Sequence, residues 1–533
     1  MIVTTNIPCA AAVSADYVIT LNGKEAAAMY TRVSKMPFNR DWPGKQRPIE
    51  QSELASVLRF EADEPVFVRV KPQRAFIRAV VRPLSEKIVP TVRDGGEIEF
   101  MISRPGQYVL ELDGMAKALH IFADPIESFR VSEGDADVLY YGAGVHYVGA
   151  VELTDNVTVY IDRDAIVYGA FYAIEAKNIR IVGGGVLDGN WEARENHNFI
   201  FPYDFSRVPE NMWKSKGACH VFSHKPDASI LPERKGAYVP GAGTSVYAGR
   251  EHFKKYLAGM AILKSGLHFY KCKNVEVSGI IINGAAGLSV NALGCDNVVF
   301  DNVKLIGMWK HNNDGIDFYN CRDCMVKNSF VRAFDDAICI KGQTGWDTES
   351  VQNILIENCV VWCDWARTLE VGVDSVAPEI KNVTFRDCDC LHHSMVVLHI
   401  GNTDRSRMEN ILFEDIRVEY TELDAKSLYQ HSDDEEFVWK RDTADLFHCD
   451  IAGPGIWSND NITGTLTGVM LKNIQVLSED DMEFPKMCIR GKDADHPCRN
   501  ITIENVTFNG KPLKTAEELH LQVNEYTENL IIR

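Results

Sequence analysis

Three aspartates lie close together along the central segment HNNDGIDFYNCRDCMVKNSFVRAFDDAICIKG. Asp335 and Asp336 follow Asp314 by 21 and 22 residues. Crowded carboxyl groups can be partly protonated and partly ionised at one pH, because repulsion between like charges raises at least one pKa. Hydrolysis of a glycosidic bond needs both states: an acid protonates the leaving oxygen, and a carboxylate activates water or attacks the anomeric carbon. The spacing therefore predicts catalytic carboxyl groups at Asp314, Asp335 and Asp336.

This cluster has two other interpretations. Clustered carboxylates also bind calcium, and Arg367 and Lys341 could pair with them in a surface salt-bridge cluster. We favour catalysis, and we expect neither a metal nor another cofactor at the site. The C-x-x-C of Cys321 and Cys324 would suit zinc, but no second Cys/His pair stands at a suitable spacing.

An internal repeat must position these residues. A phrase of Asn, an apolar residue, any residue and another apolar residue recurs, mostly at intervals of 22 to 32 residues, as in NVEVSG, NVVFDN, NILIEN, NVTFRD and NITIEN. The alternation is typical of strands. Such strands bury their apolar side only when successive coils stack in parallel, about 4.8 Å apart. The pattern predicts an all-β, right-handed parallel β-helix with an asparagine ladder at one turn. Leucine-rich repeats are disfavoured because their leucine spacing and helical halves are missing.

Two parts of the chain depart from the repeat. Residues 1–135 contain short alternating runs separated by Gly, Pro and Asp, and predict a β-sandwich-like accessory domain before a catalytic β-helix at 136–533. An insertion near 190–261 is rich in aromatic residues, Pro and Gly. It is either a loop that covers substrate or an oligomer contact. A second insertion near 421–465 carries a charge run that we interpret as a solvated face.

Stacking the coils predicts which side chains lie together. DGIDF and DAICI align when Asp314 lies under Asp336, and RTLEVG then places Arg367 over Asp336. Two apolar columns should point inward, namely Leu288, Ile316, Ile338, Leu369, Leu398 and Val290, Phe318, Ile340, Val371, Ile400. By strand alternation, the residues between them should point outward and form a solvent-facing patch around the aspartates. The predicted substrate-binding residues are Asn312, Asn313, Asp317, Lys341, Arg367, Glu370 and His399.

At these residues the chain resembles glycoside hydrolase family 28, the polygalacturonase family, and the related β-helical family 49. Asn312-Asn313-Asp314 matches the family 28 motif Asn-Thr-Asp with Asn in the middle place, and Asp335-Asp336 matches its Asp-Asp pair. The resemblance spans roughly residues 139–510. It implies that Asp335 is the general acid, while Asp314 and Asp336 activate water with inversion. An N-terminal sandwich is more like family 49, which cleaves α-glucans.

The chain departs from family 28 at the residues that hold galacturonate. Ala366-Arg367-Thr368 stands where that family has Gly-His-Gly, and Leu398-His399-Ile400 replaces its Arg-Ile-Lys. Since Glu370 would also repel a uronate, we expect a neutral glycan or oligosaccharide, with exo action if the loop at 190–261 closes the groove. The competing hypotheses are a polysaccharide lyase or epimerase acting on a uronate polymer, and a non-catalytic carbohydrate-binding β-helix.

The net charge of −19 and the pI of about 5.3 argue against binding to nucleic acid or to an anionic membrane. No apolar run approaches the roughly 18 residues of a membrane span. The N-terminus lacks the basic and apolar regions of a signal peptide, and the chain has 14 cysteines. We therefore expect a cytoplasmic protein, or a secreted one if a signal peptide has been removed. Besides a carbohydrate substrate, a second copy of the chain is a candidate partner.

Overall fold

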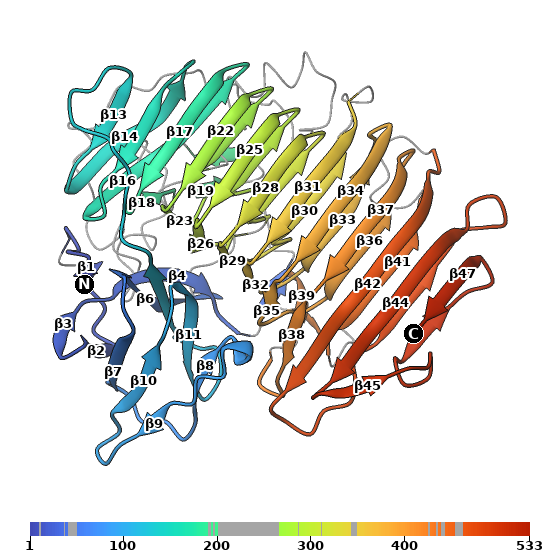
Figure 1. Cartoon of the computed structure of the whole chain (residues 1–533), viewed down its shortest axis with the longest axis horizontal. Coiled ribbons are helices and arrows are strands. Elements are labelled where there is room, and N and C mark those ends of the chain that lie inside the picture. The colour runs from blue at the N-terminus through green and yellow to red at the C-terminus, as the bar shows by residue number, and fades with distance from the viewer. Residues whose placement is uncertain are drawn as a thin grey trace.

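The computed structural model describes the chain except residues 10–11, 37, 41–50, 190–192, 196–197, 201–265, 286, 311, 343–348, 425–426, 433–434, 439–442 and 454–461. In the described part, strands dominate and a parallel β-helix occupies most of the length (Figure 1). No helix among these residues is long and apolar enough to cross a membrane. The fold predicted from the repeat is confirmed.

Most of the described residues between 2 and 124 form two packed sheets, which we call the N-terminal sandwich. One sheet contains β1 (Ile2–Thr4), β4 (Met29–Ser34), β6 (Ser52–Ala62), β8 (Ala79–Arg82), β11 (Gly106–Leu112) and β12 (Leu119–Asp124). The other contains β2 (Tyr17–Leu21), β3 (Lys24–Ala26), β7 (Val66–Pro72), β9 (Thr91–Val92) and β10 (Ile98–Ile102). Their alternating apolar residues, such as Phe60, Val68 and Phe100, meet in one buried core.

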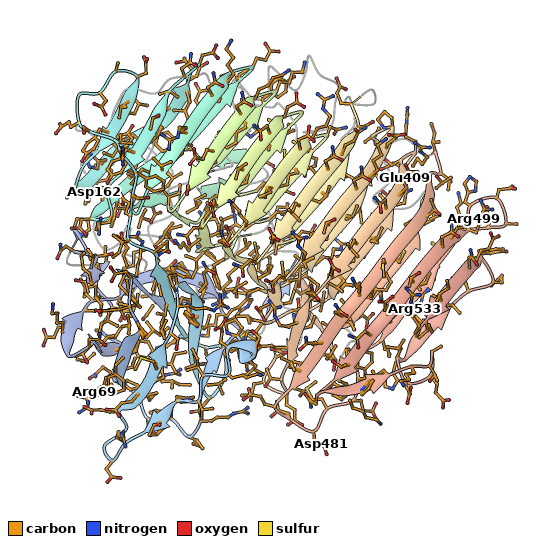
Figure 2. All side chains as sticks on the ribbon, viewed as in Figure 1. Arg69, Asp162, Glu409, Asp481, Arg499 and Arg533 are labelled. Atoms are coloured by element: carbon orange, nitrogen blue, oxygen red, sulfur yellow. The ribbon has the colours of Figure 1, made fainter. Side chains whose placement is uncertain are left out.

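The β-helix begins with β13 (Val138–Tyr141), β14 (Gly144–Leu153) and β16 (Ala165–Ile174), and its coils then present three faces. The first face contains β15 (Thr158–Ile161), β17 (Lys177–Gly183), β22 (Lys273–Ser278), β25 (Asp296–Asp301), β28 (Arg322–Lys327), β31 (Val351–Glu357), β34 (Glu379–Arg386), β37 (Arg407–Glu414), β42 (Thr465–Ser478), β44 (Cys498–Phe508) and β47 (Thr527–Ile532). Charged side chains such as those of Glu409, Arg499 and Arg533 lie on this part of the molecule (Figure 2).

The second face contains β18 (Val186–Asp188), β23 (Ile281–Asn283), β26 (Lys304–Ile306), β29 (Phe330–Ala333), β32 (Val360–Cys363), β35 (Asp389–Cys390) and β38 (Arg417–Tyr420). The third contains β21 (Leu267–Tyr270), β24 (Val290–Leu293), β27 (Ile316–Tyr319), β30 (Ile338–Gly342), β33 (Arg367–Ser375), β36 (Val396–Asn402), β41 (Asp445–Ile451), β43 (Met487–Arg490) and β46 (Leu521–Val523). Strands one coil apart pair in parallel on each face.

The inward columns were predicted correctly from Ile316 onward, since Ile338, Leu369 and Leu398 stack on it in the buried core. The register of the preceding coil was predicted wrongly, by a shift of two residues. Val290, not Leu288, pairs with Ile316. A shift of two residues keeps every side chain on its own side of a strand, so the apolar pattern alone could not fix this register.

The expected asparagine ladder is present where each coil enters the first face. Asn353 has a φ of 57°, in the left-handed region that Asn tolerates. Its Nδ2 donates to Asp323 Oδ1 at 2.8 Å, and its Oδ1 accepts from Asn382 Nδ2 at 2.9 Å. Each asparagine therefore fixes the turn and also links two coils. Most of the described buried cysteines, including Cys321 and Cys324, act as small core residues.

The N-terminal sandwich packs against the second face. Lys304 of β26 pairs with Asp124 of β12, and Arg82 of β8 pairs with Glu419 of β38. The linker between β12 and β13 carries the chain from one unit to the other. These contacts join strands that are far apart in sequence (Figure 1).

The two predicted insertions lie partly outside the described residues. Of the stretch at 190–261, the structure describes the hairpin of β19 (Ala193–Glu195) and β20 (Asn198–Ile200). Within 421–465, β39 (Ser427–Ser432) pairs with β40 (Glu435–Val438) and, in parallel, with β5 (Phe38–Arg40). The charge run therefore belongs in part to a small sheet with the N-terminal segment, a pairing that the sequence pattern did not predict.

Replacing Asn353 tests the ladder. Asn353→Ala loses two hydrogen bonds. It also places in the left-handed region an alanine, whose side chain cannot hydrogen-bond to its surroundings, and this conformation costs about 1–2 kcal/mol by itself. Asn353→Gly loses the same hydrogen bonds but keeps the conformational freedom. We expect the alanine variant to have the lower free energy of unfolding in denaturant titrations. Equal losses for Ala and Gly would contradict the left-handed requirement.

Candidate active site

The three predicted aspartates lie at the corner where the second face turns into the third. Asp314 precedes β27, and Asp335 and Asp336 precede β30. Gly315 N donates to Asp336 O at 2.9 Å, and Ala337 N donates to Arg367 O at 2.9 Å. These parallel ladder bonds place Asp314 next to Asp336, and Asp336 next to Arg367, on successive coils. The stacking predicted from DGIDF, DAICI and RTLEVG is confirmed.

Asn313 holds the backbone of this corner. Its Oδ1 accepts from Lys310 N at 2.9 Å, its Nδ2 donates to Ala285 O at 3.1 Å and to Gly287 O, and its own carbonyl accepts from Asp335 N at 3.2 Å. Its side chain is fully buried, and both Oδ1 and Nδ2 of the amide form hydrogen bonds. These bonds give Asn313 a structural role at the corner, and its predicted contact with substrate stays a prediction. Its neighbour Asn312 reaches Asp335, with Nδ2 3.5 Å from Oδ2.

Lys341 compensates the negative charge of this corner. Its Nζ lies 3.0 Å from Asp317 Oδ1, 3.2 Å from Asp314 Oδ2 and 3.5 Å from Asp336 Oδ2. Burial alone would lower the pKa of Lys341, but the carboxylates raise it well above its usual value. Burial also raises the pKa of Asp314 well above its usual range, and that of Asp317 to about 6. The corner therefore holds a permanent cation among carboxyl groups of unequal acidity.

Asp336 is the strongly ionised member. Arg367 donates to its Oδ1 from the backbone N at 3.2 Å and from Nη1 at 3.4 Å. Burial would raise the pKa of Asp336, but Arg367 and Lys341 outweigh burial and hold it well below the usual range. Glu370 lies on the same strand as Arg367, with Oε1 3.4 Å from Arg367 Nε. Burial, followed by the charge of Asp336, raises the pKa of Glu370 well above its usual value.

His399 extends the cluster to the next coil. Its Nδ1 lies 2.9 Å from Glu370 Oε1, and its Nε2 lies 3.9 Å from Asp450 Oδ1. The following coil adds His448, which pairs in register with His399. His448 and Asp450 are not among the predicted site residues, because their segment falls within the predicted insertion at 421–465. The alternating run DLFHCDI of β41 was the signal that could have found them.

The cluster is buried, and the predicted solvent-facing patch is wrong in this respect. Asp317 and Glu370 are 0% exposed, Asp314 is 4% exposed and His399 is 6% exposed. Strand alternation correctly predicted that these side chains point away from the coil interior. It could not predict their exposure, which depends on what packs over the strand and not on the pattern along it.

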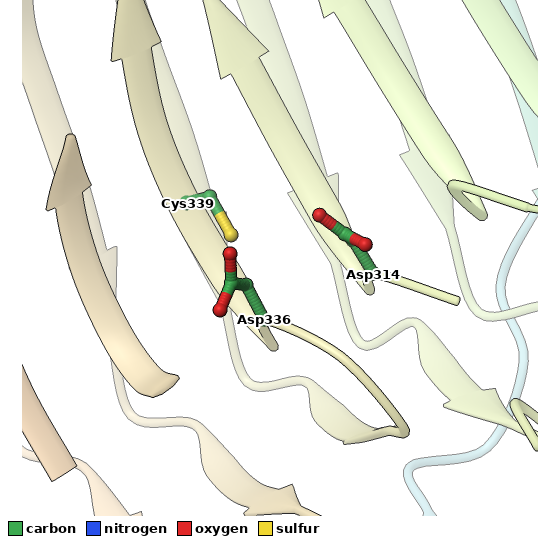
Figure 3. A group of neighbouring side chains, drawn as sticks. All are labelled: Asp314, Asp336 and Cys339. Carbon is green, nitrogen blue, oxygen red and sulfur yellow. The ribbon is translucent and has the colours of Figure 1, made fainter. Parts of the chain in front are cut away.

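Asp314, Asp336 and Cys339 are close enough to hold a metal ion, since one candidate ligand atom from each lies within 4.8 Å of the others (Figure 3). However, Lys341 Nζ already contacts both carboxylates. An ammonium group in that place satisfies the charge that a cation would otherwise satisfy. The donor set is therefore better explained as an ion-paired carboxyl cluster than as a calcium site with six to eight oxygen ligands.

Residues 234–419 match the model of glycosyl hydrolases family 28. A stretch of 200 residues is 24% identical to an exo-poly-alpha-D-galacturonosidase of Dickeya chrysanthemi, covering 36% of this chain and 28% of that protein. The chain thus spans less than a third of the length of that relative. Residues 234–419, which the family model matches, contain all three candidate catalytic aspartates.

Among solved structures, Dex49A from Penicillium minioluteum is similar over 99% of this chain and 96% of its own, with a TM-score of 0.59 and 13% identity. An exopolygalacturonase from Thermotoga maritima is similar over 70% of this chain and 85% of its own, with a TM-score of 0.46 and 17% identity. The first likeness shows the fold along almost the whole chain. The family match is limited to residues 234–419, which contain the three aspartates.

The raised pKa of Asp317 predicts a pH dependence of stability. The unfolded chain releases this proton near its ordinary value of 3.8, while the folded protein keeps it up to about pH 6. Between these values the unfolded state binds fewer protons, so this carboxyl makes the folded protein less stable as pH rises. In Asp317→Asn this loss is absent. We expect the stability of the wild type relative to the variant to fall from pH 4 to pH 6.

Denaturant unfolding at several pH values measures this difference. Asp495→Asn, at an exposed position, is the matched control and should follow the wild type throughout. A difference between wild type and Asp317→Asn that stays constant or grows with rising pH would contradict the assignment.

Proposed function

We propose that the chain is an inverting glycoside hydrolase in which Asp335 is the general acid and Asp314 and Asp336 hold the attacking water. The observation that carries this proposal is the stacking of Asp314 and Asp336 on adjacent coils, with carboxylate oxygens within 4.8 Å of each other. One water molecule can hydrogen-bond to two oxygens at such a separation. A free water held by carboxyl groups is the arrangement that inversion requires.

The pKa shifts of Asp314 and Asp336 differ in direction, and this difference supports different roles for the two water-binding groups. The pKa of Asp336 is held low by Arg367 and Lys341 against the effect of burial, whereas that of Asp314 is raised by burial. Asp336 is therefore the base that accepts the proton from water, and Asp314 orients the water by hydrogen bonding. General bases and acids of this kind contribute about 10²–10⁴-fold to rate.

Asp335 is assigned as the acid by its place in the motif and by its surroundings. It is the first member of the Asp-Asp pair, and its backbone is fixed by Asn313 and by Cys363, whose Sγ donates to Asp335 O at 3.2 Å. Asn312 Nδ2 approaches its Oδ2. These contacts fix the carboxyl group beside the water-binding pair while a glycosidic oxygen is protonated.

A neutral glycan suits this site better than a uronate. Binding a uronate carboxylate needs a cation that is free to pair with it. Lys341 is already shared by three aspartates, and Arg367 is shared by Asp336 and Glu370. The imidazole of His399, which is 6% exposed, offers polar atoms suited to sugar hydroxyl groups. We propose exo action on a neutral glycan or oligosaccharide. Galacturonan hydrolysis is the second candidate, favoured by the relative from Dickeya chrysanthemi.

Replacing the acid tests the reaction type. Asp335→Asn removes the proton donor without changing the size of the side chain, and we expect kcat to fall about 10²–10⁴-fold on any glycan that the wild type cleaves. Reducing-end release measures the rate, and NMR of the first product measures the anomeric configuration, which should be inverted. Asp495→Asn is the control. Full activity in Asp335→Asn would refute the role, and unsaturated products that absorb ultraviolet light would indicate a lyase.

A substrate panel tests the sugar class and the mode of cleavage. We expect hydrolysis of a neutral α-glucan or its oligosaccharides at a kcat/KM at least tenfold above that for polygalacturonate, because no cation among the described site residues is free for a uronate. Products of one size from the earliest time points would indicate exo action. A preference for polygalacturonate would establish the second candidate, and a random ladder of products would refute exo action.

A further inference from the structure

A cleft of about 470 Å³ lies where the N-terminal sandwich meets the β-helix. It is lined by the sandwich, by the linker that follows β12, and by the corner between the first and second faces of the coils. The carboxyl cluster lies at the next corner, between the second and third faces. Since the residues that line the cleft include none of the candidate catalytic groups, the cleft is a separate site.

The cleft continues along the stack of coils. A neighbouring hollow of about 480 Å³ shares five lining residues with it, namely Glu86, Arg104, Asn328, Asn358 and Asp389. Asn302, Asn328 and Asn358 line it on successive coils. Because coils repeat about every 4.8 Å, these coils and the next one span roughly 14 Å. A hollow elongated in this way suits a chain of several sugar units better than a compact ligand.

The lining is polar but is not built for an anion. It contains amide, hydroxyl and carboxylate groups, and its acids outnumber its bases. Arg104 is paired with Glu86. Polyanions are repelled by such a surface, whereas side-chain amides and carboxylates hydrogen-bond well to sugar hydroxyls. Among the described residues, the carboxylates of the cleft form no group close enough to hold a metal ion.

Two further features point to a ligand. Arg59 lines the cleft with a side chain only 6% exposed, held by Asp124 at 2.8 Å and Glu61 at 3.1 Å. Its Nη1 is buried and has no hydrogen-bond partner among the described residues. A buried donor without a partner is destabilising, and a ligand hydroxyl that approaches it from the cleft would remove this penalty. Phe129, partly exposed beside Gly279, offers an apolar ring to a sugar face.

We propose that this cleft binds a segment of neutral glycan as a second, non-catalytic site. A polymer held there is tethered to the chain that cleaves it, so its local concentration near the carboxyl cluster rises. The choice of a glycan that is also the substrate rests on the proposed function, but binding at the cleft does not require that any bond be broken.

Variants of the cleft test this site in the full chain carrying Asp335→Asn, so that the polymer stays intact. Phe129→Ala removes the ring, and Arg104→Ala removes an exposed polar group at the mouth of the cleft. Ile77→Ala and Arg93→Ala are matched controls, because Ile77 is exposed on the sandwich and Arg93 is an exposed arginine paired with Glu99. The probes are a soluble α-glucan, a soluble β-glucan and polygalacturonate, with affinity electrophoresis and calorimetry as the measurements.

We expect one of the neutral polymers to bind, with affinity at least tenfold lower in Phe129→Ala and Arg104→Ala and unchanged in the controls. The cleft variants should also hydrolyse a short oligosaccharide at the wild-type rate when Asp335 is present. The proposal is overturned if no neutral polymer binds, if the cleft variants bind like the controls, or if polygalacturonate is preferred. Failure of the proposed function has a different signature, namely hydrolysis that persists in Asp335→Asn.

Discussion

The structure depends on one constraint: successive coils pair in parallel and in register. Each residue of a coil then lies next to its equivalents in the adjacent coils, about 4.8 Å away. Apolar residues in equivalent positions build a continuous core, as Ile316, Ile338 and Leu369 do. Asparagines in equivalent positions build a ladder of side-chain hydrogen bonds. The same constraint brings Asp314 beside Asp336, so the fold creates the crowded carboxyl groups of the candidate active site.

Crowding has an electrostatic cost that the surroundings offset. Buried carboxylates are stable only when they are paired, hydrogen-bonded or neutral. Lys341 pairs with three aspartates, and Arg367 pairs with Asp336 and Glu370. The result is a gradient of acidity, in which Asp336 is ionised while the pKa values of Asp314 and Glu370 are raised. In the function that we propose, Lys341 and Arg367 are therefore not available to pair with a uronate carboxylate.

The N-terminal sandwich is held to the β-helix by buried charges as well as apolar contacts. His392 lies between Glu111 of the sandwich and Asp424, and these carboxylates raise its pKa to about 9 although burial opposes the charged form. Arg82 joins Glu111 to Glu419 of the second face. Such networks fix relative orientation because a displaced partner leaves an unpaired buried charge. A rigid junction is also what allows a cleft between the two units to have a defined shape.

The repeat, the inward columns from Ile316 onward and the stacking of Asp314, Asp336 and Arg367 follow from the sequence alone, because the local pattern sets strand period and coil length. The pattern leaves the register at Val290 open, since a shift of two residues preserves it. The burial of the cluster, the hydrogen bonds of Asn313 at the corner and the position of Asp450 beside His399 became known from the three-dimensional structure. Burial, ionisation and contacts between distant coils depend on what surrounds a residue in space, which no single segment encodes.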